Sequence, residues 1–266
     1  MQPTDITLAY KNALKTGETF RFRCRQCGKC CKNREDILLN PYDLHRACSV
    51  LGIAHRDFIE RYCEVYVGES SRFPCVLLKP VGPEKACPLL RGNRCSAHKG
   101  KPTVCALFPL GRAMRYAAPA ATPSVSPASS ASPVEQENSG NVENGNGGAG
   151  ENELFYFFNG ATCGARDEEH TVAEWLSEFN LQESEAWFLE WSKELGEIAI
   201  TIHDLEQKLR PKLMEPIFGA VFTGMYLNYY AGASFMEQFR ANSQKVKEML
   251  GAIKSEVEKA YGRDNV

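Results

Sequence analysis

Residues 24–31 read CRQCGKCC and bring four cysteines close together along the chain: Cys24, Cys27, Cys30 and Cys31. A thiolate is a soft, strongly donating ligand, and Cys-x-x-Cys spacing lets one short loop present two sulfurs to one metal ion or one iron–sulfur cluster. The first three cysteines also match the opening of the bacterial ferredoxin pattern for a 4Fe–4S cluster. Because adjacent side chains point apart in extended backbone, we expect Cys30 and Cys31 to serve two metals or to leave one thiol spare.

Further cysteines lie downstream in loops that contain proline or glycine: Cys87, Cys95, Cys105 and Cys163. With the opening run they make eight cysteines in predicted loops. That number suits one iron–sulfur cluster with a second site, or two zinc sites of four thiolates each. The count does not choose between these arrangements.

Several of these cysteine-containing segments resemble those of a known protein family. The opening run, the later CPLL and RCSAHKGKPTVCALFP, and a CGA before a helix resemble the YkgJ-type cysteine cluster family, a zinc- or iron-chelating domain with a CxxCxxCC motif. The resemblance implies these metal ligands: Cys24, Cys27, Cys30, Cys31, Cys87, Cys95, Cys105 and Cys163. The family includes enzymes that N-methylate lysines of flagellin, so the resemblance also admits a methyltransferase that uses S-adenosylmethionine. The chain departs from the family pattern at His98, where an aromatic residue is expected, and at Lys101, which replaces arginine.

The other cysteines are expected to be structural. Cys48 and Cys63 fall on the apolar faces of predicted helices, and Cys75 lies in a predicted strand, a context that favours the core over a metal. His98 stands three residues after Cys95 and would suit a Cys-x-x-His chelate, although a single histidine in a lysine-rich loop is more often solvated.

Cations surround the opening run: Arg21, Arg23, Arg25, Lys29, Lys32 and Arg34. They would keep thiolates ionised, offset the charge of an anionic cluster, or contact an anionic partner. A solvated rim is the equally weighted alternative, because exposed charges are common beside loops.

Sequence patterns predict an α+β fold, mainly helical, with a cysteine-rich metal-binding core and a few short strands. ETFRFRC alternates apolar and polar residues, which predicts a strand leading to Cys24, and FPCVLLKP and ELFYFF read as two more strands. Asn40 and Gly52 are typical first and last caps of a helix, and a second helix is predicted over residues 55–66. Beyond Thr171, which begins a capping-box pattern, helices are predicted over residues 183–209 and 235–261.

Residues 117–153 are dominated by Ala, Pro, Ser, Asn and Gly, so we expect a disordered insertion there. If Cys163 belongs to the same site as the earlier cysteines, residues 1–116 and 154–266 form a single domain around that insertion. The aromatic residues of the predicted helices are expected to be core: Trp175, Phe179, Trp187, Phe188 and Trp191. We also expect the uncharged stretch 216–236 to be core ending in a turn, because its glycines, Asn228 and tyrosines do not suit a membrane helix.

The composition of the chain argues against some classes of function. The chain has 266 residues, 43% of them hydrophobic, and a formal net charge of -2, which argues against a protein that binds nucleic acid or a membrane surface as a whole. Its first residues show no export signal, so its 11 cysteines are expected in a reducing cytoplasm, where clustered thiols more often bind metal than form disulfides.

The leading hypothesis is a cytoplasmic protein that holds an iron–sulfur cluster, or iron or zinc, in a redox or structural role. No nucleophile–base pair stands beside the cysteines, and no P-loop, GxGxxG, HExxH or GxSxG motif is present. The alternatives are an enzyme that methylates lysines of a protein substrate at a metal-supported site, and a structural zinc module that presents its helices to a protein partner.

Overall fold

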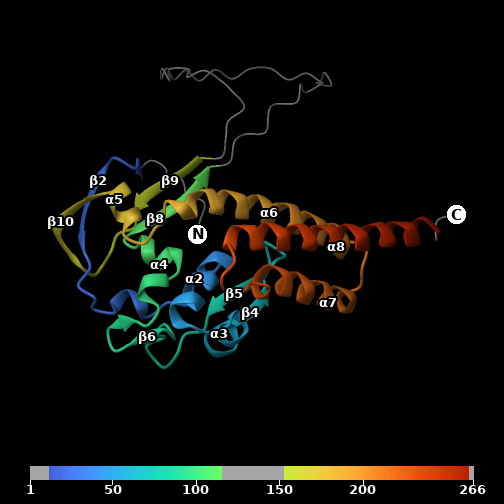
Figure 1. Cartoon of the computed structure of the whole chain (residues 1–266), viewed down its shortest axis with the longest axis horizontal. Coiled ribbons are helices and arrows are strands. Elements are labelled where there is room, and N and C mark those ends of the chain that lie inside the picture. Colours follow the sequence, from blue (N-terminus) through green and yellow to red (C-terminus); the bar gives the residue numbers. More distant parts are fainter. Residues whose placement is uncertain (1–11, 116–152, 264–266) are drawn as a thin grey trace, which may run out of the picture.

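The computed structural model describes residues 12–115 and 153–263. Figure 1 shows an elongated molecule, with short strands and loops at one end and long helices extending toward the other. Helix α8 (Phe235–Arg263) ends at the far tip of the helical end. The α+β class, mainly helical with several short strands, is confirmed.

Helix α6 (Glu183–Glu206) and α8 lie side by side and run in the same direction. Arg240 bonds Glu190 at 2.7 Å near the start of the pair, and Lys254 bonds Asp204 at 2.6 Å farther along. The residue numbers of both partners increase from the first ion pair to the second, so the two helices are parallel. Amphipathic periodicity predicted both helices, and this packing buries apolar residues of each.

The uncharged stretch folds back beneath these helices (Figure 1). It contains most of α7 (Pro211–Phe222) and a π-helical turn, η3 (Thr223–Leu227), whose Met225 is fully buried. The core interpretation is therefore confirmed. None of the helices within residues 12–115 and 153–263 has the length and apolar character needed to cross a membrane.

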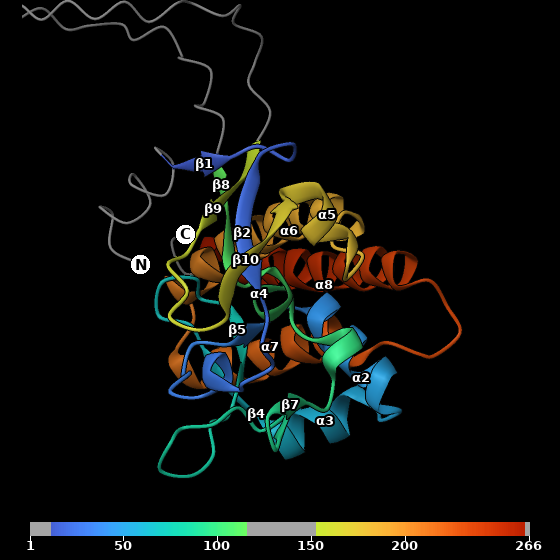
Figure 2. The ribbon, with the colours of Figure 1, turned by 90° about the vertical axis from the view of Figure 1, so that its left-hand side faces the viewer.

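Short antiparallel sheets build the other end of the molecule (Figure 2). The first has the order β1 (Ala13–Leu14), β9 (Glu153–Phe158), β8 (Leu110–Arg115). A second pairs β2 (Thr19–Arg23) with β10 (Ala165–Thr171), and a third has the order β3 (Leu38–Leu39), β5 (Pro74–Leu78), β4 (Cys63–Val67). The smallest is the hairpin of β6 (Leu90–Arg91) and β7 (Arg94–Cys95). The three strands predicted from sequence correspond to β2, β5 and β9.

The predicted insertion lies outside the described residues except for Glu153, which opens β9. The strands that flank it, β8 and β9, pair with each other over their whole lengths, from Leu110 opposite Phe158 to Arg115 opposite Glu153. The chain thus leaves this sheet at the end of β8 and re-enters it at the start of β9, the strand paired with β8.

Helix α2 (Pro41–Leu51) forms as predicted: the Asn40 side chain accepts a hydrogen bond from the Asp43 N–H at 2.7 Å, and Gly52 ends the helix with φ of 64°. The second predicted helix is too long by four residues. Helix α3 (His55–Tyr62) stops where Cys63 begins β4, because residues 63–67 pair with β5. The prediction that Cys63 lies on a helix face is therefore wrong, since cross-strand pairing overrides the helical pattern.

The capping box predicted at Thr171 begins α5 (Val172–Ser177). Its hydroxyl accepts from the Glu174 N–H at 3.1 Å, and the Glu174 carboxylate accepts from the Thr171 N–H at 2.7 Å. Such a reciprocal cap satisfies two backbone donors that the helix itself cannot use.

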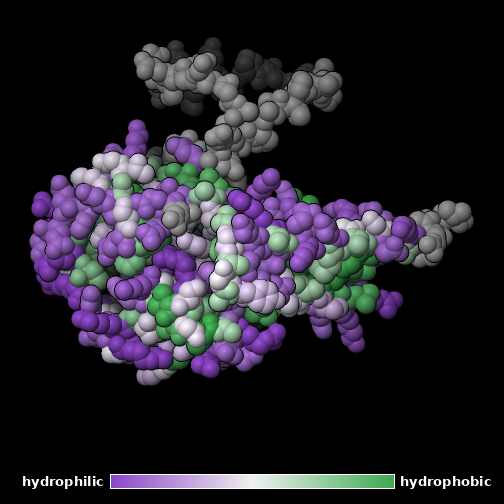
Figure 3. All heavy atoms as spheres, in the orientation of Figure 1, coloured by the Kyte–Doolittle hydropathy of each residue, from purple (hydrophilic) through white to green (hydrophobic). Residues whose placement is uncertain are grey.

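The predicted aromatic core residues divide between two clusters. Trp187 and Trp191 belong to the main core between α6, α7, α8 and the β3–β5–β4 sheet, whereas Trp175 and Phe179 belong to a smaller core beside β2 and β9. Phe188 is only partly buried. Hydrophilic residues cover most of the face seen in Figure 3, with apolar patches scattered among them.

Candidate metal centre

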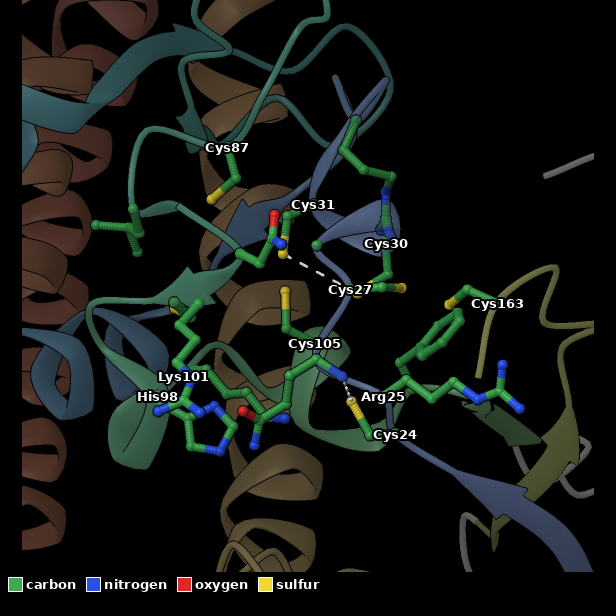
Figure 4. A pocket seen from close by; sticks show the side chains of 18 of the residues that line it. Cys24, Arg25, Cys27, Cys30, Cys31, Cys87, His98, Lys101, Cys105 and Cys163 are labelled. Atoms are coloured by element: carbon green, nitrogen blue, oxygen red, sulfur yellow. Dashed lines mark hydrogen bonds between the residues drawn. The ribbon is translucent and has the colours of Figure 1, made fainter. Parts of the chain in front are cut away.

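One cavity of about 250 Å³ collects the predicted metal ligands. Its lining includes every one of them: Cys24, Cys27, Cys30, Cys31, Cys87, Cys95, Cys105 and Cys163 (Figure 4). They come from three separate segments of the chain, and all are free thiols. The structure therefore brings distant cysteines to one place, as the sequence hypothesis required.

The opening run is a compact turn that follows strand β2. Gln26 and Gly28 adopt positive φ angles of 49° and 70°, and the Cys31 N–H bonds the Gly28 carbonyl at 3.0 Å to form the 3₁₀ turn η1 (Lys29–Cys31). In this turn the Sγ atoms of Cys30 and Cys31 approach to 4.0 Å. The expectation that these two side chains point apart is thus wrong, because it assumed extended backbone.

The second group of cysteines lies in a loop held against the opening run. The Cys87 N–H donates to the Cys31 carbonyl at 2.7 Å, and the small β6–β7 hairpin places Cys95 opposite Leu90. Cys105 lies within the short helix α4 (Thr103–Leu107). The prediction that Cys105 lies in a loop is therefore wrong, because the N–H groups of Cys105 and Ala106 close a helical turn on the Pro102 carbonyl. The thiols of Cys87, Cys95 and Cys105 all pack against the main hydrophobic core.

Helix α2 anchors the start of α4, the short helix that carries Cys105. Asp43, 2% exposed, accepts hydrogen bonds from the N–H of Thr103 at 2.7 Å and from its hydroxyl at 2.6 Å. Burial raises the pKa of this carboxyl. In the turn η2 (His98–Gly100), the backbone of Gly100 lies so close to α2 that an added Cβ would stand 2.3 Å from the Arg46 carbonyl oxygen.

Cys163 reaches the cavity from the loop between β9 and β10. The next residue, Gly164, has φ of 82°, and an added Cβ would stand 2.3 Å from the Phe22 ring. Only glycine fits this close approach without strain. Glycine at this position therefore lets the loop press against β2 and present Cys163 beside the opening run.

Cations, and no carboxylate, accompany the thiols around the cavity. The charged side chains in its lining are Arg25, Arg34, Arg94 and Lys101. Arg34 bonds Asp36 at 2.6 Å, and Lys101 Nζ lies 3.9 Å from the centre of the Phe179 ring. A lining whose charged groups are all cations suits a bound group that carries net negative charge.

Of the six cations predicted to surround the opening run, two therefore line the cavity, Arg25 and Arg34. Others are paired elsewhere: Arg23 bonds Asp167 at 2.9 Å, and Lys32 bonds Glu84 at 3.0 Å. Sequence reasoning missed Arg94 and Lys101 as members of the site. Their positions beside Cys95 and Cys105 on the same loop were the available signal.

Five thiols of the cavity resist ionisation. Burial raises the pKa of Cys87, Cys95 and Cys105. A hydrogen bond with Cys31, together with burial, raises the pKa of Cys30. Burial and the charges of nearby thiols raise the pKa of Cys163 to about 11. Metal binding must therefore displace protons from these sulfurs.

The remaining cysteines do not line the cavity. Cys48 is 3% exposed within α2, and burial raises its pKa to about 12. Cys63 and Cys75 lie partly buried in the β4–β5 hairpin. His98 lines the cavity and is exposed, and its ring packs edge-on to Phe179 with centroids 5.7 Å apart.

Within residues 12–115 and 153–263, no three Cys, His, Asp or Glu side chains already stand where they would jointly hold a metal ion. The donors nevertheless suit zinc or iron, because thiolate is the ligand that both metals take in all-sulfur sites. The cavity is thus lined by the right donors, whose side chains must close around a metal when it binds.

Comparison with known families identifies the segment that carries most of these donors. Residues 23–123 match the model of the CxxCxxCC family, which is described as "Putative zinc- or iron-chelating domain". This segment is similar to the CxxCxxCC family. The matched range includes every cysteine of the cavity except Cys163, which the structure adds from outside that range. No curated protein and no solved structure matches the chain, and the relation to flagellin lysine methylases stays a prediction.

Proposed function

We propose that the cavity holds iron in thiolate-ligated iron–sulfur form and that the chain is a redox or structural iron–sulfur protein. The observation that carries this proposal is the convergence of eight thiols and no carboxylate on one cavity. Such a donor set matches the all-sulfur ligation of iron–sulfur clusters. The family assignment supports chelation of zinc or iron.

The size of the cavity favours a polyatomic group over a single ion. A cavity of about 10–15 Å³ is already large enough to hold one water molecule. The cavity measures about 250 Å³, so four thiols closing around a lone zinc ion would leave much of it empty. An inorganic cluster with its own sulfides fills such a space better.

The charge of the lining supports the same proposal. Iron–sulfur clusters held by four thiolates carry net negative charge, and their potentials depend on nearby charge and hydrogen bonds. Arg25, Arg94 and Lys101 face the cavity without an ion pair to any carboxylate within the described part of the chain. They are available to offset a cluster's charge.

The test is metal and sulfide analysis of the full chain purified without oxygen. We expect a brown protein with visible absorption and stoichiometric iron and acid-labile sulfide, both retained in the matched control Cys75→Ser. Both should fall sharply in Cys27→Ser. A colourless protein that holds zinc alone would contradict the proposal and favour the structural zinc module.

A further inference from the structure

We propose that the eight thiols divide into two metal centres of four sulfurs each. The division rests on the proposed function only in requiring that the cavity binds metal. The inner centre would be held by Cys31, Cys87, Cys95 and Cys105. The outer centre would be held by Cys24, Cys27, Cys30 and Cys163.

The outer thiols lie in the opening run and in the Cys163 loop beside it. An added Cβ at Gly164 would stand 2.3 Å from the Phe22 ring, so the Cys163 loop lies tightly against β2, the strand that leads into the opening run. Figure 4 shows the Cys163 side chain directed toward the part of the opening run that carries Cys27 and Cys30. None of these four thiols packs against a hydrophobic core cluster.

Three of the inner thiols share one support. Cys87, Cys95 and Cys105 all pack against the main hydrophobic core. In Figure 4 the side chains of Cys31 and Cys105 point toward one another. The 2.7 Å bond from the Cys87 N–H to the Cys31 carbonyl fixes Cys31 beside this group.

The adjacent pair Cys30–Cys31 stands where the two groups meet. Its two Sγ atoms lie 4.0 Å apart. The Cys31 carbonyl accepts from the Cys87 N–H, and the Cys31 side chain points toward Cys105, which assigns Cys31 to the inner set (Figure 4). Cys163 points toward the part of the opening run that carries Cys27 and Cys30, which assigns Cys30 to the outer set (Figure 4).

The 3₁₀ turn η1 carries both cysteines of this pair. In this proposal it therefore holds one ligand of each centre.

The test compares double variants of the full chain by native mass spectrometry, after reconstitution with ferrous iron and sulfide without oxygen. Cys30→Ser/Cys163→Ser removes two ligands of the outer set and should leave one centre. Cys31→Ser/Cys163→Ser removes one ligand from each set and should leave none. Wild type and the control Cys75→Ser should carry two centres, and circular dichroism checks that each variant is folded.

Because loss of the inner metal can unfold the chain, Cys24→Ser/Cys163→Ser provides an assay confined to the outer set. A folded chain of this variant with one centre supports the division, and the same variant with two centres or none overturns it. A wild type that carries one centre also overturns it. If the wild type takes up two zinc ions and no iron, the iron–sulfur function fails, and halving of the zinc in this variant still supports the division.

Discussion

The two ends of the cavity differ in what stands behind their thiols. Cys87, Cys95 and Cys105 pack against the main hydrophobic core, and the buried Asp43 bonds Thr103 at the start of α4, the helix that carries Cys105. At the opposite end Cys24 is exposed, and Cys163 belongs to a surface loop that lies against Phe22 of β2. Identical ligand chemistry is thus supported by rigid structure on one side and by surface loops on the other.

This contrast indicates different roles for the two ends. Metal bound among core-packed loops contributes directly to folding, because the loops cannot pack correctly without it. Metal bound by exposed thiols exchanges more readily and lies within reach of reactants or reductants. We expect the inner end to be structural and the outer end to be the accessible one.

The largest expected difference is in stability. Cys105→Ser should lower the free energy of unfolding by about 4 kcal/mol or more, the range associated with loss of a metal site from a core. Cys163→Ser should lower it by less than about 1 kcal/mol, because its loop lies at the surface. Denaturant unfolding of the metal-loaded chain, followed by circular dichroism, measures both. Equal losses would contradict the contrast between the two ends.

A matched pair of glycines gives a smaller effect. Gly100→Ala forces η2 away from the Arg46 carbonyl, and Gly164→Ala forces the Cys163 loop away from Phe22. Each should cost about 1–3 kcal/mol through overpacking or strain. Gly100→Ala should reduce metal retention at the inner end, and Gly164→Ala at the outer end. Each variant is combined with Cys24→Ser/Cys163→Ser and measured by native mass spectrometry. Gly100→Ala should lower the fraction of chains that retain the remaining metal centre, and Gly164→Ala should leave that fraction unchanged.

The smallest effect concerns the rate of metal loss. A chelator added to the loaded chain should remove the outer metal at least about tenfold faster than the inner, a difference of about 1.4 kcal/mol in activation free energy. Stopped-flow absorbance should show two phases in wild type and only the slow phase in Cys24→Ser/Cys163→Ser. A single phase in wild type would mean that both ends are equally accessible.

Much of this organisation was predictable because its signals are local. The caps Asn40, Gly52 and Thr171 act within one turn, and Cys-x-x-Cys spacing is a property of a single loop. The gathering of distant cysteines could be expected as well, since exposed reduced thiols in several loops gain most from a shared metal.

The remaining features depend on contacts distant in sequence. Helix α3 ends at Tyr62 because β4 pairs with β5, and nothing in residues 55–66 announces that partner. Asp43 reads as an ordinary first-turn helix residue, yet it anchors Thr103 sixty positions away. The division of the cavity likewise depends on a 3₁₀ turn at Cys30 and Cys31 that the CxxCxxCC motif alone does not specify.

X-ray absorption at the iron edge of the full chain, purified without oxygen, examines the ligands themselves. Thiolate and sulfide ligation from the eight-cysteine cavity predicts that sulfur alone surrounds the iron. A first shell that contains nitrogen or oxygen, or a chain that carries zinc and no iron, would contradict an iron–sulfur centre in this cavity.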